Sequence, residues 1–516
     1  MTLSFAGYSF DFTALTTGDY YEPLDPNVTH GSGGIQATVG QLSYGAGTTV
    51  VDAHFEARFQ RTSRGICWQA SAMHPDPIKG IKTRISPLPL GRLLVPLGRE
   101  ITLDEGQGSC FVFPTGYYPI RHASVSATGV TPDAGPLPWW GAQFLLFEAP
   151  ERILYVRGPK HPFGWKRFWA CRHGNSLTLE LYSEAKACER TSAYMTPFWY
   201  IEEVAPREEG IDDYQRWLVD SYGLVPFKQR VDVPSWLPEI GLVVVLHGRA
   251  YNDKVCLTFE QMIERARALA GRFPAELTLL FIVGFDGRID FNWPGASPDE
   301  ALGGPQGFRT FTETAHQIGY HVMVHLNVWG VAYDSPTYRQ LCEHQVRDSE
   351  GRLVGWDYDW DYDEIQERVF AYISPDAPPW RHVLVNRVRS LVTDYGIDAV
   401  YLDQATTYVN DARHDHGRGV AALYHELKAA LPGTLLAGES ISEQVMFLYP
   451  LANLGPLVRR CCYTACAGPI CVTLHSHYPL RTGPVSGLDR RSPGHSSSSM
   501  LWRRPTTGLA PFRLSI

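Results

Sequence analysis

A regular alternation of apolar runs and amphipathic segments in the middle of the chain most constrains its fold. Apolar runs of strand length occur at 240–246, 277–283, 321–326, 398–402 and 434–437, and segments with helical periodicity separate them. Such serial repeats predict a parallel sheet, which right-handed crossovers curl towards a barrel. We therefore expect an α/β fold with a (β/α)8 TIM-type barrel, incomplete at about five βα units.

Local signals mark the ends of the expected helices. Thr258 is a favoured N-cap residue, with Glu260 and Gln261 in the first turn that follows it. Pro378 suits the first turn of another helix, and Gly396 suits its end. Between the third strand and this helix lie almost 50 residues rich in aromatic and acidic side chains. Because compact domains rarely hold long loops without a function, we expect this stretch to be a functional loop.

The residues on either side of the barrel have different patterns. Residues 1–230 contain short alternating runs such as 48–59 and 176–182, separated by turn residues, which predicts an antiparallel β-sandwich domain. The truncated barrel is expected to span 231–456. Residues 457–516 hold eight arginines, no lysine and one acidic residue, without strand or helix periodicity. This composition is typical of a coding sequence translated in a shifted frame, and a disordered tail is the alternative.

Composition excludes several functional classes. The net charge of −8 and the absence of a basic stripe argue against nucleic-acid binding. No run of 18 apolar residues predicts a membrane span, and the N-terminus does not resemble a signal peptide. Six of the ten cysteines are scattered up to Cys342, which suits free thiols in a reducing compartment, and the other four crowd together between Cys461 and Cys471. We therefore expect a cytoplasmic protein, whose oligomeric state the sequence leaves open.

Polar side chains follow each of the five apolar runs. In a (β/α)8 barrel the carboxyl ends of the strands carry the chemistry. The candidate site residues at these positions are His247, Asp286, His325, Asn327, Asp403, Gln404 and Glu439. We expect these side chains to converge at one end of the barrel.

Asp403 and Glu439 form the sharpest pair among these candidates, since they end consecutive strands. Adjacent strands lie about 4.8 Å apart, so the two carboxyl groups can sit about 5–5.5 Å from each other, the spacing of retaining glycosidases. Asp403 would then be the nucleophile and Glu439 the acid/base. This division requires Glu439 to be the less solvated carboxyl, so that it keeps its proton.

Each candidate also has a plain structural explanation. Asp286-Gly287 is a common turn dipeptide, and His247 and His325 can be core histidines with satisfied hydrogen bonds. Asp403 is harder to explain as a helix cap, because no helical pattern begins after it. Glu439 is a poorer N-cap than the neighbouring Ser440.

Aromatic side chains after the second and third strands offer a second indication. Trp293, Trp329 and Trp356 fall in segments expected on the same face as the acids. Flat rings there would stack on the faces of sugars, as tryptophan does in many carbohydrate sites. The alternative is that these rings pack against the rim of the barrel.

The run at 395–404 (YGIDAVYLDQ), with Trp380-Arg381 upstream, resembles retaining α-glycosidases of the α-amylase and α-galactosidase-like barrels. This resemblance implies that the aspartate ending the fourth strand, Asp403, is the nucleophile. In the α-amylase-like and endo-α-N-acetylgalactosaminidase-like branches the acid is a glutamate on strand five, which matches Glu439. The α-galactosidase branch instead uses an aspartate after strand six, and Tyr401 stands where the α-amylase branch has arginine.

The sequence thus predicts a retaining α-glycosidase that binds an oligosaccharide or glycoside and needs no cofactor or metal. One alternative is a metal-dependent barrel hydrolase with His247, Asp286, Asp403 and Glu439 as ligands. Another is an inactive or carbohydrate-binding product of a truncated gene. A minor alternative is a zinc site among the cysteines from Cys461 to Cys471, with His475 and His477 nearby, although the spacing of these cysteines matches no CxxC pair.

Overall fold

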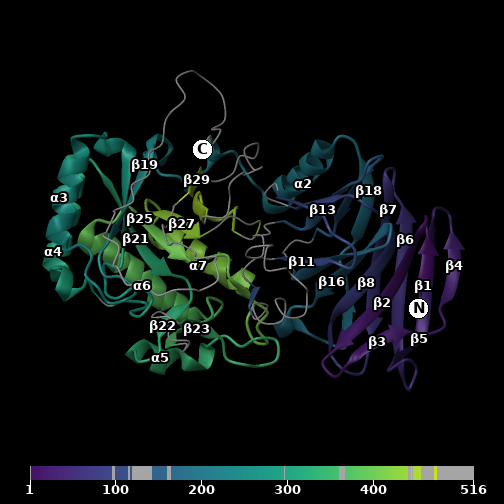
Figure 1. Cartoon of the computed structure of the whole chain (residues 1–516). Helices are drawn as coiled ribbons and strands as arrows, with labels where there is room; N and C mark the ends of the chain where they lie inside the picture. Colours follow the sequence, from purple (N-terminus) through teal and green to yellow (C-terminus); the bar gives the residue numbers. More distant parts are fainter. Residues whose placement is uncertain are drawn as a thin grey trace, which may run out of the picture.

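The computed structural model describes residues 2–95, 99–113, 117–118, 142–159, 164–295, 297–358, 367–439, 443, 445–454 and 470–473. An antiparallel β region built from the N-terminal part of the chain lies beside a parallel α/β region (Figure 1). The helix α2 (Arg207–Tyr222) leads from the first region to the second.

The N-terminal region consists of two antiparallel layers that share the strand β3 (Tyr20–Pro23), which pairs with β2 in one layer and β5 in the other. One layer contains β1 (Thr2–Phe5), β2 (Tyr8–Thr16), β8 (Ile78–Pro89), β11 (Gly108–Phe113), β15 (Lys166–His173) and β16 (Ser176–Glu184). The other contains β4 (Asn27–Gly31), β5 (Gly34–Tyr44), β6 (Thr49–Arg61), β7 (Gly65–Met73), β9 (Arg92–Val95), β10 (Arg99–Ile101), β13 (Phe144–Glu148), β14 (Ile153–Arg157), β17 (Ala193–Met195) and β18 (Trp199–Val204).

Rings from the two layers meet in a common core. Phe10 of β2 lies 5.3 Å from Trp68 of β7, and Phe168 of β15 lies 5.6 Å from Trp199 of β18. Buried and partly exposed residues alternate along β2, as the period of a half-buried strand requires. The layered, sandwich-like organisation expected from the alternating runs is therefore present.

The second region contains a parallel sheet of seven strands. In spatial order these are β19 (Leu242–His247), β20 (Thr278–Val283), β21 (His321–Asn327), β25 (Ala399–Asp403), β27 (Leu435–Glu439), β28 (Leu451–Leu454) and β29 (Ile470–Thr473). The five predicted strands are confirmed. Two further short strands, β28 and β29, continue the sheet in parallel. We missed them because both are only four residues long and the described residues between β27 and β28 form turns. The described strands form a half-barrel and not a closed barrel.

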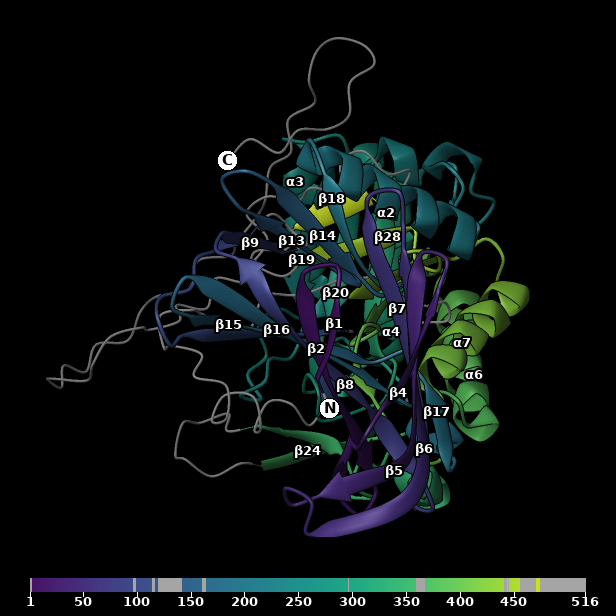
Figure 2. The same ribbon diagram turned by 90° about the vertical axis from the view of Figure 1, so that its right-hand side faces the viewer.

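Helices cover the outer face of this sheet (Figures 1 and 2). They are α3 (Phe259–Ala270), α4 (Gly304–Ile318), α6 (Pro378–Tyr395) and α7 (His416–Ala430). Thr258 caps α3 in a capping box with Gln261, and Gly396 ends α6 in the left-handed conformation. Along β25, Val400 and Leu402 pack under the helices, whereas Ala399 and Tyr401 face the concave side.

The stretch after β21 is not the long loop that we expected. It folds into a small antiparallel sheet with the spatial order β22 (Gly330–Ala332), β24 (Glu367–Tyr372) and β23 (Gly355–Tyr358). Along the chain, the short helix α5 (Pro336–Leu341) lies between β22 and β23. The prediction failed because these strands are short and their aromatic residues stabilise one another, as in the stacked pair Trp356–Phe370. Trp360 and its neighbours, 359–366, lie outside the described residues.

The two regions contact each other through the loops that leave the parallel strands. The short strands β12 (Tyr117–Tyr118) and β26 (Tyr408–Val409) pair across the junction. The backbone N–H of Ala187 also donates to Asn410 Oδ1 at 2.7 Å. The boundaries at residues 230 and 456 stay predictions, and almost all of the tail lies outside the described residues. In the described parts of the chain, no helix is long and apolar enough to cross a membrane.

Candidate active site

Three polar side chains stand side by side at the carboxyl end of the parallel sheet. Asn327 of β21 is in register with Asp403 of β25, and Leu402 is in register with Gly438, the residue before Glu439 on β27. Because the strands are parallel and adjacent, the three side chains share one edge of the sheet. The register thus places the two predicted catalytic carboxyls next to each other.

Asp403 is held by polar contacts from the neighbouring strand. Its Oδ2 accepts a hydrogen bond from Asn327 Nδ2 at 3.2 Å, and its Oδ1 lies 3.8 Å from His325 Nε2. Asn327 is itself fixed, because its Oδ1 accepts hydrogen bonds from the backbone N–H groups of Trp329 and Gly330, both at 2.8 Å. With one fifth of its side chain exposed, Asp403 keeps a path to solvent.

Gln404 connects the two acids through its backbone. Its φ of 57° lies in the left-handed region, which a residue other than glycine adopts at a cost of about 1–3 kcal/mol. In this conformation its N–H donates to Glu439 Oε2 at 2.9 Å, and its carbonyl accepts from Trp329 Nε1 at 3.0 Å. The strained turn therefore directs a donor at Glu439 directly after Asp403.

Glu439 lies in an environment that favours its neutral form. Burial and the nearby charge of Asp403 raise its pKa to about 8, against the opposing hydrogen bond from Gln404. Since one carboxyl oxygen accepts that hydrogen bond, the other is free to carry the proton. At neutral pH the side chain is therefore positioned as a proton donor beside Asp403.

His325 lies beneath the acids in an aromatic setting. Its ring stacks on Tyr401 at 5.5 Å and lies 5.2 Å from Trp293. Burial lowers its pKa, but contact with Asp403 and the charges of Asp290 and Asp286 outweigh this effect, so the pKa is raised above its ordinary value.

Asp290 is a further acid of the site that we did not predict. It follows β20 with a φ of 67°, and it accepts a hydrogen bond from Trp293 Nε1 at 3.4 Å. Burial and the charge of Asp403 raise its pKa to about 7, and its own charge in turn raises that of Glu439. No sequence signal marks this residue, because its place depends on the folded turn after β20.

Asp286 forms a buried ion pair with Arg387 of α6, at 3.5 Å. Burial raises the pKa of Asp286 to about 6, while Arg387 opposes that shift. Gly295 lies so close that a Cβ there would meet Asp286 Oδ2 at 1.8 Å. Arg387 was also missed, although its spacing from the buried Leu384 and Leu391 puts it on the apolar face of its helix and could have marked it.

The other predicted ligand residues lie in different settings. His247 is exposed at the end of β19. Trp293 is 4% exposed, and it packs against His325 and orients Asp290. Trp329 is completely buried, so it supports Gln404 and has no free ring face for a sugar. Trp356 lies on β23 in the small sheet, stacked on Phe370.

Within the described residues, no group of three or more His, Cys, Asp or Glu side chains is arranged to hold a metal ion. The cysteines from Cys461 to Cys466 lie outside these residues, and only the backbone of Cys471 lies within them.

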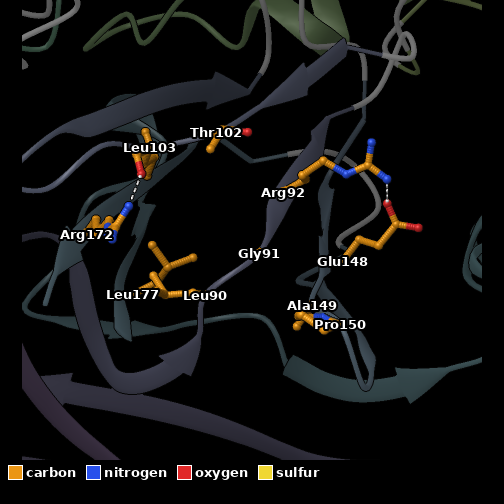
Figure 3. Close-up of a pocket in the computed structure, with 10 residues that line it drawn as sticks. All are labelled: Leu90, Gly91, Arg92, Thr102, Leu103, Glu148, Ala149, Pro150, Arg172 and Leu177. Atoms are coloured by element: carbon orange, nitrogen blue, oxygen red, sulfur yellow. Dashed lines mark hydrogen bonds and ion pairs between the residues drawn. The ribbon is translucent and has the colours of Figure 1, made fainter. Parts of the chain in front are cut away.

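One hollow in the described structure lies on the N-terminal region and includes none of these acids (Figure 3). It is an open groove of about 470 Å³. The charges at its rim are paired, Arg92 with Glu148 and Arg172 with the carbonyl of Leu103. The converging side chains at the sheet edge, and not this groove, therefore define the candidate site.

Comparisons with known proteins give the fold a context. A family model described as a domain of unknown function (DUF6259) matches residues 208–447. No curated protein matches the chain.

Among solved structures, the fold is similar to α-N-acetylgalactosaminidase NagBb from Bifidobacterium bifidum. The GalNAc complex is 13% identical over 89% of this chain and 81% of that chain, with a TM-score of 0.62. The Gal-NHAc-DNJ complex is 12% identical over 88% and 78%, with a TM-score of 0.63. At these identities the similarity establishes a shared glycosidase-like architecture.

Proposed function

We propose that this protein is a glycoside hydrolase, a retaining α-glycosidase with Asp403 as nucleophile and Glu439 as acid/base. The observation that carries the proposal is the environment of Glu439, whose pKa is raised to about 8 at the end of the strand next to Asp403. An acid beside a nucleophilic carboxylate is the pairing that double displacement at a sugar carbon requires. Neighbouring strands about 4.8 Å apart suit the carboxyl spacing of about 5–5.5 Å found in retaining enzymes.

In the first step, Asp403 attacks the anomeric carbon and forms an ester bond while the bond to the leaving oxygen breaks. Glu439 gives its proton to that oxygen, so the aglycone leaves as a neutral alcohol. Asn327 holds the attacking carboxylate by a hydrogen bond, and His325 lies against its other oxygen. The ring oxygen stabilises the developing positive charge at the anomeric carbon, as in other oxocarbenium-like transition states.

In the second step, Glu439 takes a proton from water, whose oxygen attacks the anomeric carbon and releases Asp403. The site supplies a reason for this change of role. Part of the shift in the pKa of Glu439 comes from the charge of Asp403, and that charge disappears when the ester forms. The pKa of Glu439 therefore falls in the intermediate, and the group becomes a base.

The similarity to a protein crystallised with GalNAc suggests terminal α-linked galactose-type sugars as first substrates to test. Asp286, which pairs with Arg387, and the exposed His247 both lie near the same sheet edge. We propose that these groups contact sugar hydroxyls, together with Asn327 and Gln404.

The test is hydrolysis of aryl α-N-acetylgalactosaminides and α-galactosides, with the first-formed anomer followed by proton NMR. Initial release of the α-anomer is expected. Release of the β-anomer would contradict double displacement, and no turnover of any α-glycoside would favour the inactive or carbohydrate-binding alternative. Loss of activity on treatment with a chelator would favour the metal-dependent hydrolase.

A further inference from the structure

Four residues after Glu439, the chain reaches a buried polar network on the N-terminal region. Glu443 is 1% exposed and accepts hydrogen bonds from the hydroxyls of Tyr214 and Tyr222 and from Gln143 Nε2. Gln143 Oε1 in turn accepts from Lys166, whose side chain is completely buried. Because a buried carboxyl is costly unless its oxygens are bonded, this network ties residue 443 firmly to the N-terminal region.

The network is continuous with the sheet layer that carries β13 and with α2. Tyr214 Oη accepts the backbone N–H of Gln143 at 2.7 Å while it donates to Glu443 Oε2. The Tyr222 hydroxyl lies 3.2 Å from Glu443 Oε1. The partners of Glu443 therefore lie in α2 or directly before β13, whereas Glu443 itself follows β27, the strand that ends with Glu439.

The residues after Glu443 are held in the same way. Met446 is buried in an apolar cluster with residues of β13, β14 and α2, and the ring of Phe447 lies 5.2 Å from that of Tyr222. Arg230 donates hydrogen bonds to the carbonyls of residues 446, 447 and 448. Apolar and polar contacts thus fix residues 446–448 against the first region and its connection to the second.

The other end of this segment returns to Glu439. Its turn is closed by hydrogen bonds from Leu448 and Tyr449 to the carbonyl of Val445. The ring of Tyr449 packs so closely on Gly438 that a Cβ there would lie 2.7 Å from it. Gly438 precedes Glu439, so the segment contacts the backbone that carries the proposed acid.

We infer that Glu443 is a positioning residue for Glu439. Through Glu443, the N-terminal region helps to position the active site. This inference rests on the proposed function. Glu443 is anchored in the N-terminal region, and the Tyr449 ring packs on Gly438, next to Glu439, in the parallel sheet. Residues 443 and 445–449 lie in the segment that contains both contacts. A shift of about 1 Å in a catalytic group can lower a rate by about two orders of magnitude, so such an anchor matters for catalysis.

Glu443→Gln tests the inference, because it keeps the shape of the side chain but replaces one acceptor with a donor that faces Gln143 Nε2. Tyr222→Phe is a milder variant that removes one hydrogen bond. Lys79→Met is the matched control. It removes the ion pair of 3.0 Å between Lys79 and Glu350, which also joins the two regions but touches neither catalytic strand exit.

The first readout is the dependence of kcat/KM, which reports the first step up to departure of the leaving group, on the leaving group. A 2,4-dinitrophenyl glycoside needs little help from an acid, whereas a methyl glycoside needs it fully. For Glu443→Gln we expect about a 10–100-fold loss on the methyl glycoside and less than a threefold loss on the dinitrophenyl glycoside. Tyr222→Phe should show the same pattern more weakly, and Lys79→Met should change neither rate. Equal losses on both substrates, or no loss on either, would overturn the inference.

The second readout is hydrogen exchange of peptides that cover residues 435–449, which needs no activity. Exchange there should rise in Glu443→Gln and not in Lys79→Met, and unchanged exchange in Glu443→Gln would overturn the anchor. If the wild-type protein hydrolyses no glycoside, the proposed function fails, and the exchange measurement still decides whether the N-terminal region holds this segment. If Glu443→Gln does not fold, Tyr222→Phe provides both readouts.

Discussion

The two ends of the strand β25 carry aspartates in opposite circumstances. Asp398 directly precedes the strand, and Asp403 is its last residue. Asp398 Oδ2 lies 2.8 Å from His316 Nε2 and accepts the backbone N–H of Val322, also at 2.8 Å. Asp403 instead has a second carboxyl on the next strand and Asp290 close by, and its charge raises the pKa of both of these acids.

The pKa values separate the two ends of the sheet. Burial raises the pKa of Asp398, but hydrogen bonds from His316, His321 and Val322 overcome this and bring it down to about 2. At the other end, burial and the charge of Asp403 raise the pKa of Glu439 to about 8 and that of Asp290 to about 7. At the Asp398 end, hydrogen bonds stabilise the carboxylate, which favours folding. At the Asp403 end, several carboxyl groups lie close together, which opposes folding and favours proton transfer.

The largest expected effect comes from Asp403→Asn, with Asp398→Asn as the matched control on the same strand. Loss of the nucleophile should lower kcat by about four orders of magnitude or more. Asp398→Asn should leave kcat within about twofold. The measurement is steady-state hydrolysis of an aryl α-glycoside, with circular dichroism to show that both variants are folded. Full activity in Asp403→Asn would remove it as the nucleophile.

Glu439→Gln is expected to show the next largest effect. General acid catalysis contributes about 10²–10⁴-fold, so turnover of a substrate with a poor leaving group should fall by that factor. A dinitrophenyl glycoside should still form the covalent intermediate, and the second step should then be slow because no base activates water. A burst of dinitrophenol followed by slow release is the expected trace. Absence of any change from wild type would assign the acid elsewhere.

The pH dependence sharpens the contrast further. The activity needs protonated Glu439, so kcat/KM should fall about tenfold per pH unit above about pH 8, the pKa of this group. Because the charge of Asp290 contributes to that raised pKa, Asp290→Asn should move the alkaline limb to lower pH. A limb that stays in place in Asp290→Asn would show that the two acids do not interact.

The smallest effect concerns stability at the opposite end of the strand. A pKa lowered to about 2 means that Asp398 stabilises the fold above its ordinary pKa near 4, and that this contribution is lost as pH falls through about 2. The His316 pKa is raised by the same pair, so its share is present at low pH and is lost as pH rises through the raised value. Asp398→Asn should therefore cost about 1–2 kcal/mol of unfolding free energy between about pH 4 and 6.5. Urea denaturation at several pH values measures this cost, and a constant difference across that range and below it would contradict the assignment.

Much of the half-barrel could be predicted because its signals are local. The apolar runs of β19, β20, β21, β25 and β27 are continuous, since helices and the concave core bury both faces. The strands β28 and β29 could not be predicted, because four-residue runs carry too little periodicity and gain their partners only in the sheet. The same holds for the small sheet of β22, β23 and β24, where pairing between distant short segments decides the structure.

For the site, the sequence by itself determined which acids end neighbouring strands, because the order of strands follows the order of the chain in a sheet of the (β/α)8 type. Asp403 and Glu439 could therefore be named from their positions alone. Only the tertiary structure decided how exposed each acid is to solvent and which residues surround it. Asp290 reaches the pair through a left-handed turn, Arg387 reaches Asp286 from a helix about 100 residues later, and Glu443 ties the acid's strand exit to a separate region. A pKa depends on burial and on charges brought together in space, and neither can be computed from spacing along the chain.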